Sequence, residues 1–262
     1  MNLIVNTEFV IDLFKLALYI ACGYVALNVY ARHVKTRWVV RLTAERFAVL
    51  TLLTVLVVAI KVFEDVVTKE SGPVDAAVLW FVRQIMPPAM VRFFEVVTLT
   101  GAARFLVPAT VALSILFYTT RHRQQAVLLA TSMACGWALT YTVKSLVDRT
   151  RPELWSTTWY WGSSFPSGHT LSTAAFATAL VIGTAQIWPK SRFFALPLAV
   201  VWVTLMGVSR LVLGVHWPTD VLAATCLGVF IPLAISLVVF KDDKHLVVSI
   251  TTERENQATL NG

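Results

Sequence analysis

Long apolar runs separated by short polar segments constrain the fold of this chain more than any other feature. Such runs lie at about 9–30, 47–63, 105–118, 126–143, 170–187, 193–208 and 221–240. About 20 helical residues cross the ~30 Å hydrocarbon core of a bilayer, and a spanning segment must satisfy its own backbone hydrogen bonds there. The pattern therefore predicts an all-α fold, a polytopic membrane helical bundle.

The first run differs from the others because it contains two charged residues, Asp12 and Lys15. Spaced three apart, they can pair on one helix face, so this segment either spans the membrane or lies along its surface. We expect six core transmembrane helices plus this extra N-terminal helix, and no cleaved signal peptide. A short amphipathic helix is predicted at 74–85, before the helix-breaking pair Pro87–Pro88.

Charge supports the membrane assignment and argues against other partners. Charged residues make up 14% of the chain, against about 25% in soluble domains. The net charge of +7 is spread over short loops rather than gathered in a patch, so we expect no nucleic-acid partner. The three cysteines lie inside apolar runs without metal-ligand spacing, and we expect no metal and no cofactor.

The basic loops predict the orientation of the chain. Segments 32–46, 121–123, 190–192 and 241–244 fall on one side of the membrane if each run spans once. By the positive-inside rule that side is cytoplasmic. Segments 144–151, 167–169 and 210–220 then face the exterior or periplasm. The pattern favours a multi-pass protein of a bacterial inner membrane.

Three cations flank a turn that opens directly into an apolar run. The turn is Pro166–Ser167–Gly168–His169, and a helix that begins there offers N–H groups and a positive dipole end to an anion. Ser167 alone would be an ordinary N-cap. Lys144 and Arg151 are seven residues apart and share a helix face if the helix continues to Pro152. Together with Arg210, they indicate a phosphate-bearing ligand.

Two of the five histidines begin apolar runs on the predicted outer face. These are His169 and His216, and Asp220 follows four residues after the second. The carboxylate alone could merely favour a helix start, but beside His216 it can accept the Nδ1 proton and orient the ring. Nucleophilic and acid–base roles fit this set. Neither histidine has the spacing of a zinc site.

Three sequence blocks carry a family resemblance. Lys144-x6-Arg151–Pro152, Pro166–Ser167–Gly168–His169 and Ser209–Arg210-x5-His216-x3-Asp220 resemble the signature of the type 2 phosphatidic acid phosphatase superfamily. The resemblance implies a membrane phosphatase that acts on lipid phosphates or pyrophosphates without a metal. Its soluble relatives lack the long apolar runs found here.

The resemblance also implies a role for each residue. His216 would attack phosphorus and form a phosphohistidine, and Asp220 would orient His216. His169 would protonate the leaving oxygen and then activate water. The phosphate would be bound by three cations and by donors at the start of a helix: Lys144, Arg151, Arg210, Ser167 and Gly168.

On this basis the chain divides into three parts: an N-terminal helix with a basic cytoplasmic loop (1–45), a membrane phosphatase domain (46–240) and a cytoplasmic tail (241–262). Candidate substrates are undecaprenyl pyrophosphate, phosphatidic acid and phosphatidylglycerol phosphate. Membrane lipids are the other expected partners. Two alternatives remain open: a phosphotransferase that uses the same phosphohistidine, and a non-enzymatic transporter with charges deep in the bundle. The sequence leaves the oligomeric state open.

Two segments near the signature have simpler interpretations. Trp155, Trp159, Tyr160 and Trp161 form either an interfacial aromatic belt or the border of an opening for a lipid tail. Asp148 and Arg149 lie between signature positions and are interpreted as a solvated pair without a role.

Overall fold

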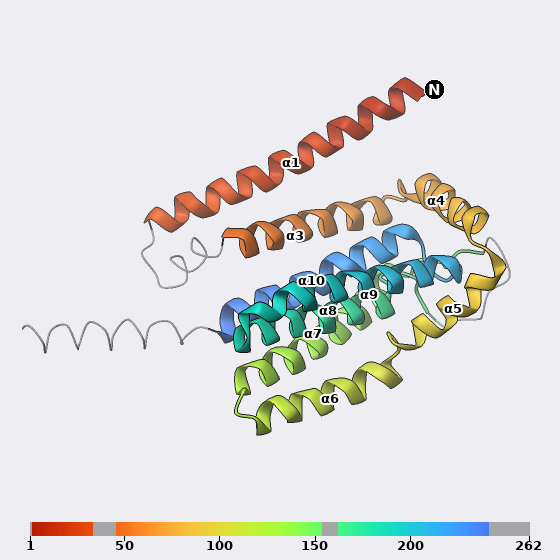
Figure 1. Cartoon of the computed structure of the whole chain (residues 1–262). Coiled ribbons are helices and arrows are strands. Elements are labelled where there is room, and N and C mark those ends of the chain that lie inside the picture. The colour runs from red at the N-terminus through yellow and green to blue at the C-terminus, as the bar shows by residue number, and fades with distance from the viewer. Residues whose placement is uncertain (1, 34–45, 154–161, 241–262) are drawn as a thin grey trace, which may run out of the picture.

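The computed structural model of the chain is a bundle of helices, described over residues 2–33, 46–153 and 162–240 (Figure 1). No strand occurs in these ranges, which confirms the all-α prediction. The helices are α1 (Asn2–His33), α3 (Arg46–Val67), α4 (Gly72–Ile85), α5 (Pro88–Leu99), α6 (Ala103–Thr119), α7 (Arg123–Val147), α8 (Gly168–Ile187), the short 3₁₀ helix η1 (Pro189–Ser191), α9 (Arg192–Val212) and α10 (Pro218–Val239).

The predicted core spans all appear as helices. Within the described residues, α3, α7, α8, α9 with η1, and α10 are long and apolar enough to cross a membrane. The pair α5 and α6, bent by 41° at its junction, provides up to a sixth span. Residues 14–30 of α1 form a further apolar helix, which packs on α3 at the periphery of the bundle. The role of α1 as a span or a surface helix stays a prediction.

Helix α8 lies at the centre because its small side chains allow close packing. It contacts α6, α7, α9 and α10, and Ala174, Ala175 and Ala179 are fully buried. Leucines of α6 and α7 surround this centre. Large apolar side chains on the outer helices, such as Ile115, Phe193 and Leu198, are exposed. This inside-out distribution is what a lipid-facing surface requires.

The contact between α8 and α10 depends on Gly228. A Cβ atom at this position would lie 2.6 Å from the Leu171 carbonyl oxygen and 2.6 Å from the Ala174 Cβ. We predict that Gly228→Ala lowers the free energy of unfolding by about 1–3 kcal/mol, because the helices must separate. The measurement is the thermal midpoint in detergent. Gly183→Ala is the control, because its nearest contact would be an ordinary 3.5 Å to Gln125; equal midpoints for both variants would contradict the prediction.

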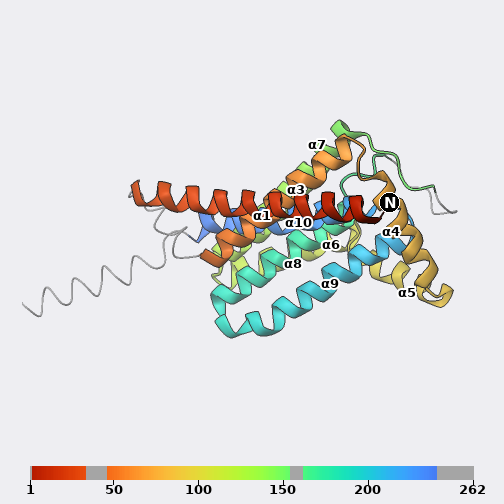
Figure 2. The same ribbon diagram turned by 90° about the horizontal axis from the view of Figure 1, so that it is seen from above.

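Two shorter helices cover one end of the bundle, as Figure 2 shows. Helix α4 has a proline in its first turn and ends before Pro87, and α5 begins directly afterwards. This confirms the predicted short helix and its interruption. Helix α4 contacts α9 and α10, and α5 contacts α9. These contacts bring α4 and α5 next to the helix ends that carry the candidate residues.

Two predicted helix ends were wrong. Helix α7 ends at Val147, where Asp148 adopts a left-handed conformation with φ of 40°, so Lys144 and Arg151 do not share a helix face. Helix α9 runs to Val212 instead of stopping near residue 208, which places Arg210 in its last turn. The extension follows from packing, because Ser209, Arg210 and Val212 are all buried against the bundle.

Some predictions fall outside the described residues. These concern the aromatic residues Trp155, Trp159, Tyr160 and Trp161, the basic loop 34–45, and the tail 241–262.

Candidate active site

The candidate residues come from four helix ends that meet beneath α4 and α5. Lys144 and Arg210 lie in the last turns of α7 and α9, while His169 and Asp220 lie in the first turns of α8 and α10. Arg151 and His216 lie in the adjoining loops. His169 is within electrostatic reach of His216 and of all three cations. The charges thus gather at helix ends, unlike the mid-membrane charges expected of a transporter.

Lys144 and Arg151 converge on one backbone carbonyl despite the early end of α7. The Lys144 ammonium donates to the Ser163 oxygen, and Arg151 Nη2 lies 3.4 Å from the same atom. Arg151 Nη1 also donates to the Val215 carbonyl at 2.8 Å and lies 3.5 Å from His216 Nε2. Arg151 therefore holds the loop that carries His216 and places a positive charge at the ring's outer nitrogen.

Arg210 is the most deeply buried cation of the cluster. Its side chain is fully buried, and its guanidinium donates to the Thr98 hydroxyl of α5. Burying a charge is costly unless hydrogen bonds and an opposite charge compensate for it. A bound anion would offset part of this cost, so the position suits phosphate binding.

The turn before α8 is held by packing and by a bond to α10. Phe165 packs with Val62 and Val66 of α3 and with Ala223 of α10. The Ser167 N–H donates to the Asp220 carbonyl at 3.2 Å, and the hydroxyls of Ser167 and Thr170 lie 3.0 Å apart. The Ser167 N–H therefore links the start of α8 to the start of α10. The N–H groups that α8 can offer to an anion begin at Gly168.

Asp220 lies beside His216 and is oriented by other donors. Its Oδ2 lies 3.5 Å from His216 Nδ1, which is longer than an ordinary hydrogen bond. The same oxygen accepts the Trp217 N–H at 2.8 Å. Both side chains are almost completely buried. The carboxylate thus faces the Nδ1 side of the imidazole, and Nε2 is on the side of Arg151.

Burial keeps His216 in its neutral form. Loss of solvation lowers the pKa of His216 to about 4 from its ordinary 6.5, and the charges of Arg210 and Arg151 act in the same direction. Asp220 opposes this shift through its negative charge. At neutral pH the ring therefore carries a lone pair, as a nucleophile requires.

The structure corrects one interpretation, because Arg149 is not part of a solvated pair. Its guanidinium contacts Asp220 Oδ1 and Asp75 Oδ2, each at 2.6 Å. Asp148 instead occupies the left-handed position that ends α7. Asp75 and Arg149 are 74 residues apart, so no local spacing could reveal the pair. The available signal was the acid Asp75 in the first turn of a short amphipathic helix.

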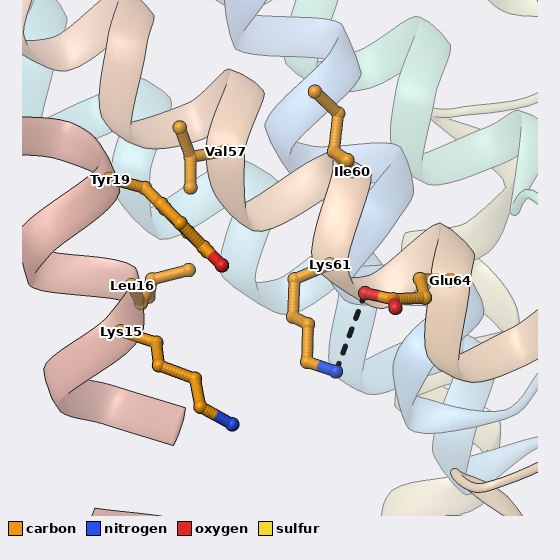
Figure 3. A pocket seen from close by; sticks show the side chains of 7 residues that line it. All are labelled: Lys15, Leu16, Tyr19, Val57, Ile60, Lys61 and Glu64. Atoms are coloured by element: carbon orange, nitrogen blue, oxygen red, sulfur yellow. Dashed lines mark ion pairs between the residues drawn. The ribbon is translucent and has the colours of Figure 1, made fainter. Parts of the chain in front are cut away.

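A pocket of about 340 Å³ lies elsewhere, between α1 and α3 (Figure 3). Lys61 of α3 pairs with Glu64 at 3.5 Å and with Asp65 at 2.7 Å. The lining residues are Lys15, Leu16, Tyr19, Val57, Ile60, Lys61 and Glu64. This set shares no member with the candidate cluster.

Comparison with known proteins agrees with this geometry. The model of the PAP2 superfamily matches residues 125–244, which include every signature position. The chain is 39% identical over 67 residues to phosphatidylglycerophosphatase B of Escherichia coli (strain K12), covering 26% of this chain and 25% of the relative. It is 35% identical over 112 residues to decaprenylphosphoryl-5-phosphoribose phosphatase of Mycobacterium tuberculosis, covering 41% and 58%. The chain thus spans about a quarter of the length of the first relative.

The fold is also shared with a solved structure. A transmembrane PAP2-type phosphatidylglycerolphosphate phosphatase from Bacillus subtilis superposes with a TM-score of 0.65 at 24% identity, covering 75% of this chain and 98% of that one. The signature positions thus lie within the segment that resembles the PAP2 superfamily, and the helical fold is shared with a transmembrane phosphatase of that type.

Proposed function

We propose that this protein is a membrane phosphatase that hydrolyses a lipid phosphate or pyrophosphate through a phosphohistidine. The observation that carries the proposal is a neutral, buried His216 placed between Asp220 and the guanidinium of Arg151. Phosphoryl transfer depends mainly on positioning and on stabilising negative charge. Three cations at one end of the bundle provide that stabilisation from the protein itself.

Two steps account for hydrolysis. In the first, His169 takes up a proton when the phosphate anion binds and offsets the cations around it. His216 Nε2 then attacks phosphorus, the bond to the leaving oxygen breaks, and His169 donates this proton to that oxygen. In the second, His169 takes a proton from water, the water oxygen attacks phosphorus, and the N–P bond breaks to release phosphate and neutral His216. Lys144, Arg151 and Arg210 neutralise the phosphoryl oxygens in both transition states.

The substrate class follows from the membrane setting and from the relatives. The two named relatives act on different lipids, phosphatidylglycerophosphate and decaprenylphosphoryl-5-phosphoribose, that both carry a phosphate. We therefore propose a lipid phosphate as the substrate, with phosphatidylglycerol phosphate, phosphatidic acid and undecaprenyl pyrophosphate as candidates. The positive-inside pattern supports an extracytoplasmic site in a bacterial inner membrane.

The test is phosphate release by the purified protein in detergent with EDTA present, using each of the three lipids. We expect release from at least one lipid, and the relative rates will rank them. Phosphate that appears only on an added acceptor lipid would identify a phosphotransferase instead. No turnover of either kind would contradict the proposed activity.

The pH dependence should report the protonation of His216. Imidazolium has no lone pair for attack, so kcat/KM should fall as the pH drops through about 4. Between pH 5 and 7 this group should cause little change, whereas an ordinary histidine would cause a decline through about 6.5. The measurement is kcat/KM from pH 3.5 to 8, with protein integrity checked at each pH. An acid limb centred near 6.5 would contradict a neutral, buried nucleophile.

A further inference from the structure

A chain of charges that is buried at both ends connects α4 to the candidate nucleophile. Asp75 of α4 is fully buried and contacts Arg149 Nη2 at 2.6 Å. Arg149 Nη1 contacts Asp220 Oδ1 at 2.6 Å, and Asp220 Oδ2 lies 3.5 Å from His216 Nδ1. Asp75, Arg149 and Asp220 can therefore act on His216 without contacting the phosphate.

Arg149 is held rigidly at the centre of this chain. Its N–H donates to the Ser163 hydroxyl at 3.0 Å, and its carbonyl accepts the Ser164 N–H at 2.8 Å. Its guanidinium also lies over the Trp217 ring, 5.7 Å from the centroid. The two backbone bonds hold the residue in place, and the Trp217 ring supports the planar guanidinium, whose geometry allows it to contact two carboxylates at once.

Asp75 also fixes the start of α10. Its Oδ1 accepts the Thr219 N–H at 3.0 Å, and its Oδ2 accepts the Thr219 hydroxyl at 2.8 Å. Thr219 directly precedes Asp220. The Asp75 carboxylate therefore binds both the Arg149 guanidinium and the backbone of the residue before Asp220. Asp75 lies outside the segment matched by the family model, residues 125–244.

We propose that Arg149 is a positioning residue that acts on His216 through Asp220, and that Asp75 holds Arg149 in place. The inference rests on the proposed phosphatase function. Arg149 and the Trp217 N–H each bind one oxygen of Asp220. The carboxylate therefore has one orientation, and its second oxygen stays on the Nδ1 side of His216.

Arg149 also offsets the negative charge that His216 experiences. The charged and titratable groups around His216 are Asp220 of α10, Arg210 of α9, His169 of α8 and Arg151 of the loop after α7, with Lys144 of α7 near Asp220. Without Arg149, the charge of Asp220 is less opposed and favours the imidazolium form. The acid limb of kcat/KM should then move to higher pH.

The experiment compares Arg149→Gln, Arg149→Lys, Asp75→Asn and the double variant Asp75→Asn/Arg149→Gln in full-length protein, with phosphatidic acid as substrate, or whichever lipid the wild type hydrolyses. We expect Arg149→Gln to lower kcat by about 10- to 100-fold, the size of effect found when a residue that orients a metal ligand is replaced. KM should stay within about twofold, because Arg149 does not bind substrate. Arg149→Lys should recover part of kcat and keep the acid limb near that of wild type.

The double variant tests whether the two residues act as one unit. If Asp75 acts by holding Arg149, the double variant should be no slower than Arg149→Gln alone. The control is Arg83→Gln, which changes an exposed arginine of the same helix α4 and should leave kcat and the acid limb unchanged.

Several results would overturn the inference. Wild-type kcat in Arg149→Gln would do so, and so would a lower kcat with an unmoved acid limb, because that indicates structural support alone. If Arg149→Gln does not give monodisperse protein, the test uses Arg149→Lys instead. A wild-type kcat in Arg149→Lys would exclude a role for the planar guanidinium of Arg149. An inactive wild-type protein would instead refute the proposed function.

Discussion

Replacing His216 with alanine is expected to reduce phosphate release by at least about 10⁴-fold, because the variant has no atom that can form the N–P bond. The loss should appear in kcat with every lipid that the wild type accepts. His122→Ala is the matched control, since His122 precedes α7 at the opposite end of that helix from Lys144. A His216→Ala variant with more than a few per cent of wild-type kcat would contradict the assignment.

The two histidines can be separated with a substrate whose leaving group needs no proton. With an activated aryl phosphate, His169→Ala should still form the phosphohistidine but hydrolyse it slowly, because water is not activated. We therefore expect a burst of aryl alcohol. The His169→Ala protein should then carry a covalently bound phosphoryl group, and the bond to that group should be stable to base and labile to acid. A bound phosphoryl group in His216→Ala but not in His169→Ala would show that the roles are reversed.

Replacing Arg210 should cause the second largest loss of activity. Its fully buried guanidinium acts where water cannot screen it, so Arg210→Gln should lower kcat/KM by about 10²- to 10³-fold. Arg210→Lys keeps the charge without the planar fork and should fall between Arg210→Gln and wild type. The measurement is initial-rate kinetics on the preferred lipid.

Inhibition by inorganic phosphate tests the same assignment. Inorganic phosphate should inhibit the wild type competitively, and Arg210→Gln should weaken this inhibition because a phosphate contact is lost. Arg123→Gln is the control, because Arg123 is exposed at the far end of α7. Unchanged phosphate inhibition in Arg210→Gln would show that Arg210 supports the fold without binding the anion.

The apolar runs predicted the fold because each spanning helix is itself a run of apolar residues that the sequence shows directly. The same runs allowed the signature residues to be placed together. Lys144, His169, Arg210 and Asp220 lie at ends of consecutive spans, and antiparallel spans bring alternate loops to the same side. Local sequence thus determines which side of the bundle each residue occupies. The orientation of that side and the three-part division of the chain stay predictions.

The helix ends and the Asp75–Arg149 contact could not be predicted in this way. Ser145, Leu146 and Val147 do not mark the end of α7, which depends on the left-handed conformation of Asp148. The sequence offers the adjacent Asp148 as a partner for Arg149, which is why the two are interpreted as a solvated pair. Asp75 instead lies on α4, and its contact with Arg149 exists only because α4 packs over the start of α10.

The placement of charges on the helices has a consequence for stability. Lys144 and Arg210 lie in the last turns of α7 and α9, and Asp220 lies in the first turn of α10. Each charge therefore faces the helix pole of opposite sign, which stabilises the helix that carries it. Active sites commonly lower the stability of a protein, so that neutral replacements raise its melting temperature. In this bundle that trade-off is reduced, because the groups that would bind phosphate also stabilise the ends of their helices.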